Sequence, residues 1–184
     1  MSKTLSAVEK VIETAEHGGT VLEVVERPSV VWVGTLTYAE DISGEPDSGA
    51  LLKRYQDLAP AAPKIDTVND EWDACININF NGGEKAKGMM FGQETASPDK
   101  QDKRYDLFTQ PAGLYMRIYN DQAAAKLLGK DKCETWELFG VLREAAGAYG
   151  YVWDAGNPIE VEYHNRRDNS WYAYLPVRKT LCRG

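Results

Sequence analysis

One pattern of apolar and polar residues recurs in this chain at an offset of 83 positions, and it restricts the possible folds more than any other feature. Residues 159–163 read Ile-Glu-Val-Glu-Tyr, a strict alternation typical of a β-strand with two different faces. Residues 76–80, which stand 83 positions earlier, alternate in the same way with asparagines at the polar positions. The same offset relates Pro28 to Pro111, and each proline precedes an apolar, strand-like run.

The recurrence extends to the helices and therefore indicates a diverged internal duplication. Residues 51–58 carry apolar side chains at helical spacing, and residues 134–141 repeat this arrangement with a broader apolar face. Each half then reads strand, helix, strand, strand, with repeat 1 at about residues 20–96 and repeat 2 at about 104–179. We therefore expect an α+β fold in which the helices cover one face of an antiparallel sheet.

Alternation, prolines and turn residues place the remaining elements. Strands are expected at residues 20–26, 29–37, 75–80, 87–93, 105–119, 159–163 and 171–177. Residues 1–19 are expected to form a helical extension outside the duplicated domain of residues 20–184. The reason is that Ser6 and Glu9 fit a capping box and that a Gly-Gly pair, which stops helices, closes the segment.

The composition argues against several classes of function. The net charge of −7 disfavours a general binder of phosphate backbones, and no basic helix-turn-helix segment precedes Thr20, so no direct contact with nucleic acid is expected. Cys75, Cys133 and Cys182 are widely spaced and the two histidines lie far apart, which gives no zinc signature; no metal or cofactor is predicted. Because the chain has neither an apolar run of about 20 residues nor a signal-peptide core, it is predicted to be cytoplasmic, with no membrane association.

Two duplicated halves can associate about a pseudo-twofold axis, and this arrangement predicts a central cleft. The apolar side chains of residues 76–80 and 159–163 are expected to point toward the helices. The polar alternates then face away from the helices and meet across the shared cleft; they are Asn77, Asn79, Glu160 and Glu162. Only the second half carries acids at these positions, and a ligand site needs an asymmetry of this kind.

Aromatic residues on the predicted strands suggest what such a cleft binds. These candidates are Trp32, Phe91, Tyr115, Tyr119, Tyr172 and Tyr174. A carboxylate among aromatic rings suits a lipophilic cation, because each ring face attracts positive charge by about 0.5–2 kcal/mol and the acid supplies the counter-charge. Partial burial raises the pKa of such an acid and disfavours an isolated carboxylate. The alternative interpretation is that the rings are core residues and the glutamates are solvated.

A family resemblance rests on a series of short motifs in the second half. The motifs are Pro-Ala-Gly-Leu-Tyr at 111–115, Thr-Trp at 135–136, Gly-Tyr at 150–151, Pro-Ile-Glu-Val-Glu-Tyr at 158–163 and Tyr-Leu-Pro-Val at 174–177. In this order they resemble the GyrI-like effector-binding family, the ligand-binding module of many AraC- and MerR-type regulators, which also occurs as free-standing proteins. The resemblance covers about residues 20–179 and is strongest from Gln110 to Lys179.

The resemblance implies a tandem strand-helix-strand-strand fold with a central cleft. It also implies a site for cationic amphipathic compounds, with a buried glutamate on the penultimate strand near tyrosines that include the tyrosine of the closing Tyr-x-Pro strand. Here these roles fall to Glu160 or Glu162 and to Tyr174. The acid of the family usually precedes an aromatic residue by two positions, where this chain has Val161, so both glutamates remain candidates.

Three functions follow from these patterns. The first is a free-standing protein that binds hydrophobic, cationic, drug-like small molecules and either sequesters or senses them; the sequence does not identify a partner that would read its ligand state, and gyrase and a regulator are both candidates. The second is a hydrolase of reactive electrophiles, with Glu162 as general base beside Tyr115 or Tyr174. The third is an interaction protein that modulates gyrase, as some members of the resembled family do.

Overall fold

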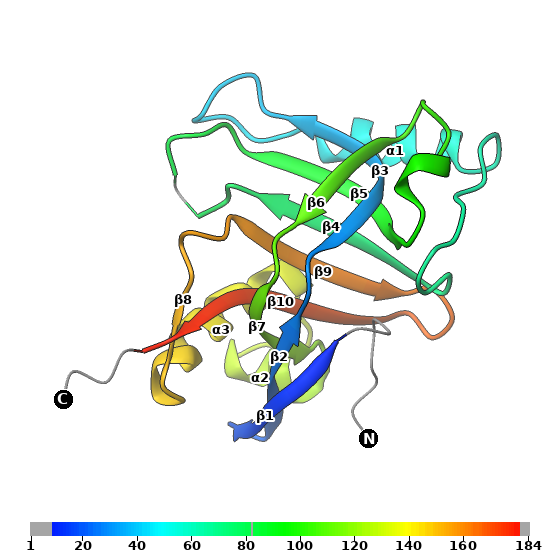
Figure 1. Ribbon diagram of the computed structural model, residues 1–184. Helices are drawn as coiled ribbons and strands as arrows, with labels where there is room; N and C mark the ends of the chain where they lie inside the picture. Colours follow the sequence, from blue (N-terminus) through cyan, green and yellow to red (C-terminus); the bar gives the residue numbers. More distant parts are fainter. Residues whose placement is uncertain (1–8, 82, 181–184) are drawn as a thin grey trace.

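The computed structural model describes residues 9–81 and 83–180, which form a ten-stranded antiparallel sheet with three α-helices (Figure 1). The strands are β1 (Lys10–His17), β2 (Thr20–Arg27), β3 (Val30–Tyr38), β4 (Trp72–Ile78), β5 (Gly88–Thr95), β6 (Asp106–Gln110), β7 (Gly113–Tyr119), β8 (Tyr151–Trp153), β9 (Ile159–Asn165) and β10 (Ser170–Lys179). The helices are α1 (Ser48–Leu58), α2 (Gln122–Leu127) and α3 (Leu138–Ala148), and short 3-10 turns span Pro98–Lys100 and Thr135–Glu137. The fold is therefore α+β and rich in sheet.

The order of the strands forces the sheet to curl. Neighbours in the sheet follow the order β1-β2-β7-β10-β9-β4-β5-β3-β6, with β8 attached to β10. Only two residues separate β2 from β3, although five strands lie between them in the sheet. The two ends of the sheet must therefore approach each other, and Figure 1 shows the chain running from β2 directly into β3. The curled sheet has an interior face and an outer face that carries the helices.

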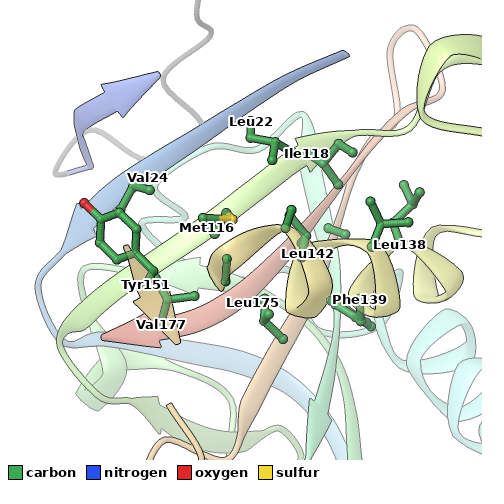
Figure 2. Packing of buried hydrophobic residues seen from close by; sticks show 14 of the residues in the cluster. Leu22, Val24, Met116, Ile118, Leu138, Phe139, Leu142, Tyr151, Leu175 and Val177 are labelled. Atoms are coloured by element: carbon green, nitrogen blue, oxygen red, sulfur yellow. The ribbon is translucent and has the colours of Figure 1, made fainter. Parts of the chain in front are cut away.

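Two hydrophobic cores follow from this shape. The first lies between the outer face and the helices, where Leu142 of α3 packs with Met116 of β7 and Leu175 of β10 (Figure 2). The second fills the interior of the curled sheet and includes Trp32 and Val161, both almost fully buried. Because there is a core on each face of the sheet, side chains on both faces of the central strands are largely buried.

The expected N-terminal helix is wrong for the residues that the structure describes. Lys10–His17 forms strand β1, antiparallel to β2, while Ser6 lies outside the described residues. Gly18 and Gly19 adopt positive φ values of 57° and 87° and join the two strands as a hairpin. The Gly-Gly pair therefore closes a turn between strands instead of stopping a helix, and pairing along the edge of β2 outweighs the weak helical periodicity.

The expected helices at residues 51–58 and 134–141 match α1 and, shifted toward the C-terminus, α3. Helix α2 was not expected. Its six residues begin at Gln122, directly after Asp121, whose side chain caps the helix by accepting a hydrogen bond from the backbone N–H of Ala124. The expected strands all appear, although the one expected at 75–80 ends at Ile78 and the segment at 105–119 is split into β6 and β7.

The predicted facing of the central strands is wrong. Ile76 and Ile159 point into the interior of the curled sheet instead of toward the helices, as do Ile78, Val161 and Tyr163. Phe80, which lies beyond the end of β4, lines a hollow beside α3. Glu162 pairs with Ala173, which packs under α3, so the polar alternates lie on the helix-bearing face. Alternation distinguishes the two faces of a strand but not which face a helix covers, because the curl supplies a second core that the pattern does not reveal.

Among the described helices, none is long and apolar enough to cross a membrane.

Candidate functional site

The two longer helices leave the middle of the outer face open. Helix α1 packs against β3 and β5, and α3 packs against β7, β8 and β10. Strands β4 and β9 lie between these two sets and pair with each other. Their outward side chains therefore form the floor of a groove, with α1 along one side and α3 along the other.

Four side chains of β4 and β9 meet on this floor. Cys75 stands opposite Glu162, and Asn77 stands opposite Glu160. The Asn77 Nδ2 donates a hydrogen bond of 3.0 Å to Glu162 Oε1, so the two strands are joined by a polar contact as well as by the backbone. The sequence patterns led us to expect that Asn77, Asn79, Glu160 and Glu162 would meet. Asn77 and the two glutamates do so on the helix-bearing face, whereas Asn79 lies beyond the end of β4 with a φ of 61° and donates to the backbone oxygen of Ala86.

A hollow of about 290 Å³ opens above this floor at its α3 end. Its lining is aromatic and apolar apart from the floor itself and one arginine; the residues are Asn77, Phe80, Met89, Trp136, Phe139, Arg143, Glu160 and Glu162. Trp136 is 61% exposed, which is unusual for the largest apolar side chain and places an aromatic ring at the rim. The hollow thus combines acids with π faces and a thioether.

A second hollow of about 530 Å³ continues the groove on the α1 side. Tyr55 and Phe91, whose ring centroids lie 6.5 Å apart, form part of its wall, and Cys75 lies on its floor. Because Cys75 is the strand partner of Glu162, the two hollows adjoin at this pair. At the far end, His164 stacks on Trp171 with a centroid distance of 4.1 Å.

The two floor glutamates differ in their charge partners. Glu160 is 4% exposed and forms an ion pair with Arg143 of α3, whose guanidinium also lies 4.7 Å from the centroid of the Trp153 ring. Burial raises the pKa of Glu160, and the nearby Arg143 charge opposes that rise. The charge of Glu160 is therefore already balanced within the protein.

Glu162 has no such balance. Burial raises its pKa to about 7, and only the hydrogen bond from Asn77 works against this shift, while Glu134 and Glu160 add to it. Within residues 9–81 and 83–180, no lysine, arginine or histidine lies within ion-pair distance of its carboxylate. Near neutral pH the groove thus contains a half-ionised acid without a counter-charge.

The predicted site residues separate onto the two faces of the sheet. Glu160, Glu162 and Phe91 line the groove. The others point into the interior or toward its end; they are Trp32, Tyr115, Tyr119, Tyr172 and Tyr174. The pairing proposed for a hydrolase is not assembled, since Tyr115 donates to the backbone oxygen of Pro111 and Tyr174 lies among interior charges.

Arg143, Trp136 and Met89 are groove residues that the sequence patterns did not reveal. Trp136 belongs to the segment 134–141, for which the sequence predicts a broad apolar helix face, but it lies in the 3-10 turn before α3. Arg143 follows Phe139 by four positions on α3, so a single cation borders that apolar face. A lone arginine beside an apolar helix face is the sequence signal that could have identified Arg143. This signal does not indicate that its partner is Glu160.

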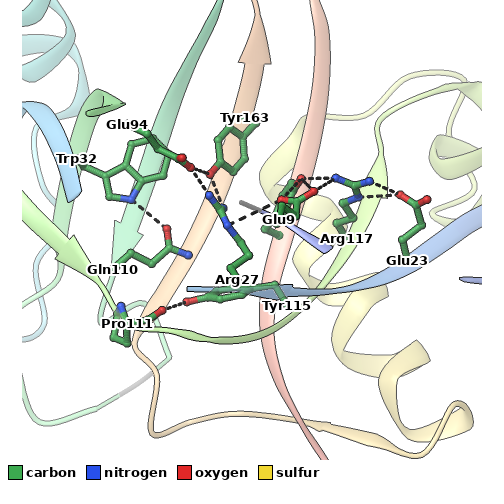
Figure 3. A network of polar contacts seen from close by, with 11 residues as sticks. Glu9, Glu23, Arg27, Trp32, Glu94, Gln110, Pro111, Tyr115, Arg117 and Tyr163 are labelled. Atoms are coloured by element: carbon green, nitrogen blue, oxygen red, sulfur yellow. Dashed lines mark hydrogen bonds and ion pairs between the residues drawn. The ribbon is translucent and has the colours of Figure 1, made fainter. Parts of the chain in front are cut away.

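The interior of the sheet contains a buried network of charges, which Figure 3 shows between the aromatic rings. Arg27 contacts Glu94 and the hydroxyl of Tyr163, and that hydroxyl in turn donates to Glu94 Oε1 over 2.5 Å. The Arg27 guanidinium also lies 5.2 Å from the centroid of the Tyr163 ring. Both ions of the Arg27–Glu94 pair are buried, with side-chain exposures of 0% and 7%.

The second half of this network is centred on Arg117. Its guanidinium pairs with Glu9 and Glu23 and donates a hydrogen bond of 2.7 Å to the Tyr174 hydroxyl. Tyr174 was proposed as a ligand residue, but its hydroxyl is engaged here and its ring is fully buried. No alternation or motif distinguishes these arginines from surface residues, so the network was not predictable from the sequence.

None of the described His, Cys, Asp and Glu side chains gather in groups of three or more that would suit a metal ion.

Comparison with known proteins identifies the fold but not a family. No known protein family and no curated protein matches the sequence. Among solved structures, SAV2435 bound to tetraphenylphosphonium is 14% identical with a TM-score of 0.56, and the match covers 85% of this chain and 93% of that one. A putative bacterial transcription regulation protein from Staphylococcus aureus MU50 is 13% identical with a TM-score of 0.55, covering 85% and 97%.

The C-terminal domain of EcmrR is 13% identical to this chain with a TM-score of 0.54, and the match covers 86% of this chain and 98% of that domain. Identities of this size establish similarity of fold alone. The fold that these proteins share with the chain extends over nearly their whole lengths, in agreement with the resemblance to the GyrI-like effector-binding family at the level of architecture.

Proposed function

We propose that this chain is a small-molecule-binding protein of the effector-binding type, and that it takes a lipophilic cation into the groove between α1 and α3. The observation that carries the proposal is Glu162, a carboxylate in an aromatic hollow with a pKa raised to about 7 and no cation within ion-pair distance among the described residues, since Arg143 of the same hollow pairs with Glu160. A ligand cation supplies the missing counter-charge, and its apolar body contacts Phe139 and Met89.

The structure offers a reason to assign the ligand charge to Glu162 and not to Glu160. Arg143 already neutralises Glu160, so a second cation there competes with an existing ion pair. Glu162 is held in place by Asn77 but remains uncompensated, and binding of a cation favours its ionised form. We therefore assign Glu160 the role of anchoring Arg143 beside the hollow.

The solved structures with the same fold support this class of ligand. SAV2435 was solved with tetraphenylphosphonium, a lipophilic cation, and the EcmrR C-terminal domain has a similar fold. We infer by analogy that this chain belongs to the same functional class, as a cytoplasmic protein whose ligand state another component reads.

The strand order also supports the inferred duplication. Read inward from β2, the strands follow β7, β10 and β9; read inward from β6, they follow β3, β5 and β4. The two series meet between β9 and β4. Position by position, each strand of one series corresponds to a strand of the other at the offset of 83 residues: β2 to β6, β7 to β3, β10 to β5 and β9 to β4. On this proposal the groove straddles the boundary between the halves, and Glu162 belongs to the second half alone.

Tetraphenylphosphonium is expected to bind the wild-type protein, and replacing Glu162 by Gln is expected to weaken binding at least tenfold at pH 8, about 1.4 kcal/mol. The substitution keeps the shape of the side chain and removes its charge. Isothermal titration calorimetry measures the dissociation constants.

Two controls distinguish recognition of the ligand's charge from nonspecific hydrophobic binding. Glu144→Gln makes the same chemical change on an exposed position of α3 and is expected to leave affinity unchanged. Tetraphenylborate has nearly the same shape as the phosphonium and the opposite charge, so it is expected to bind far more weakly. Equal affinities of wild type and Glu162→Gln for the phosphonium, or equal binding of both ions, would overturn the proposal.

A further inference from the structure

The interior charge network contains a carboxylate that comes from outside the sheet's central strands. Glu9 immediately precedes the edge strand β1, yet its side chain is 1% exposed and lies between the two interior arginines. Arg117 pairs with Glu9 Oε1, and the Arg27 Nε lies 3.8 Å from Glu9 Oε2. The Tyr174 hydroxyl lies 3.3 Å and 3.2 Å from the two carboxylate oxygens, so the group is held from three sides.

The groups that hold Glu9 are fixed far more firmly than Glu9 itself. Arg27, Arg117 and Tyr174 belong to β2, β7 and β10, three adjacent strands of the sheet, and all three side chains are at most 1% exposed. By contrast, β1 has no fully buried residue, its described pairing is with β2 alone, and its register is interrupted between Val11 and Glu13. The basic pocket is therefore preorganised, while its occupant is attached to an edge strand that, beyond its pairing with β2, is held by hydrogen bonds from the Tyr149 and Tyr151 hydroxyls.

Glu9 also satisfies this pocket incompletely. The Arg27 Nε is buried, and no acceptor among the described residues lies within hydrogen-bond distance; Glu9 Oε2 is its nearest opposite charge at 3.8 Å. A buried donor without a hydrogen-bond partner costs free energy. A small carboxylate from solution is not tied to the β1 backbone as Glu9 is, so it can turn to accept a hydrogen bond from the Arg27 Nε.

We propose that Arg27, Arg117 and Tyr174 form a carboxylate-binding site inside the curled sheet, which the chain's own Glu9 occupies and which a small carboxylate from solution takes when Glu9 is removed or withdrawn. This site lies on the opposite face of the sheet from the groove at Glu162 and is independent of the proposed function. In the intact protein Glu9 is an internal competitor, so an external carboxylate binds only as β1 leaves.

Chemical rescue of Glu9→Ala tests the site. The substitution removes a CH₂–COO⁻ unit, and acetate closely replaces what is lost. In sodium acetate, compared with sodium chloride at equal ionic strength, the melting temperature of Glu9→Ala is expected to rise saturably by about 5 °C, while that of wild type is unchanged. Pivalate carries the same charge on a bulkier group and is expected to give no rescue.

Val25→Ala provides the matched control, because Val25 is buried on β2 and its truncation destabilises the interior without removing a charge. If acetate raises the melting temperature of this variant as much as that of Glu9→Ala, the effect is a general one of the salt and the proposal is wrong. If Glu9→Ala is unfolded in chloride, acetate is expected to restore its β-sheet circular dichroism signal. Failure to do so, or equal rescue by pivalate, contradicts a built carboxylate site.

Discussion

Replacing Glu162 by Gln is expected to stabilise the ligand-free protein by about 2–3 kcal/mol at pH 8 and to change its stability little at pH 5. Burial raises the pKa of Glu162 from its usual 4.5 to about 7 in the folded state. The folded protein therefore holds a proton on Glu162 that the unfolded chain releases between these two values. Wild-type stability is highest below the unfolded pKa and falls as the pH rises through about 7. Glutamine cannot ionise and avoids this loss.

Urea denaturation of both proteins at pH 5 and pH 8 measures the difference. The control is Glu144→Gln, whose exposed side chain is expected to give the same small change at both pH values. A free-energy difference between wild type and Glu162→Gln that does not depend on pH is incompatible with a raised pKa at this position. It would also remove the reason for expecting a cation in the groove.

Replacing Arg27 by Met is expected to destabilise the protein by about 3–5 kcal/mol, the cost typical of removing one member of a buried ion pair. Arg27 has no exposed surface, and it neutralises Glu94 while contacting the Tyr163 hydroxyl. Methionine fills most of the volume but leaves Glu94 as a buried charge. The expected result is a lower urea midpoint with an unchanged dependence of the free energy on urea concentration.

A double variant distinguishes charge from packing at this site. Adding Glu94→Gln to Arg27→Met removes the buried carboxylate that has lost its ion-pair partner and is expected to recover part of the lost stability. A packing defect would persist or increase in the double variant. Arg178→Met, at an exposed position near the end of β10, is the matched control and is expected to change stability by less than about 0.5 kcal/mol. Equal effects of Arg27→Met and Arg178→Met would show that the interior network contributes little.

Much of the secondary structure was predictable because it depends on local periodicity. The alternation at residues 76–80 and 159–163 correctly predicts β4 and β9, and the helical spacing at 51–58 correctly predicts α1. The N-terminal segment was wrongly predicted as a helix. Strand β1 forms because it pairs with β2, and the spacing of apolar residues within one segment does not reveal such pairing.

The site was predictable in part, for a related reason. The expectation that Asn77, Glu160 and Glu162 lie together agrees with their cross-strand register and with the hydrogen bond between Asn77 and Glu162. The aromatic residues assigned to the same site lie mostly on the other face, because the curl of the sheet gives a strand two buried sides. Arg143 was invisible to the sequence patterns, since its pairing with Glu160 depends on how α3 lies across the sheet.

Proton release during cation binding tests the central claim most directly. At pH 7, Glu162 is about half protonated in the free protein, so binding of tetraphenylphosphonium to the ionised form is expected to release up to about half a proton per ligand. Titration calorimetry in two buffers of different ionisation enthalpy measures this number. The account predicts release from the wild type and none from Glu162→Gln; binding without proton release, or the same release from both proteins, would contradict it.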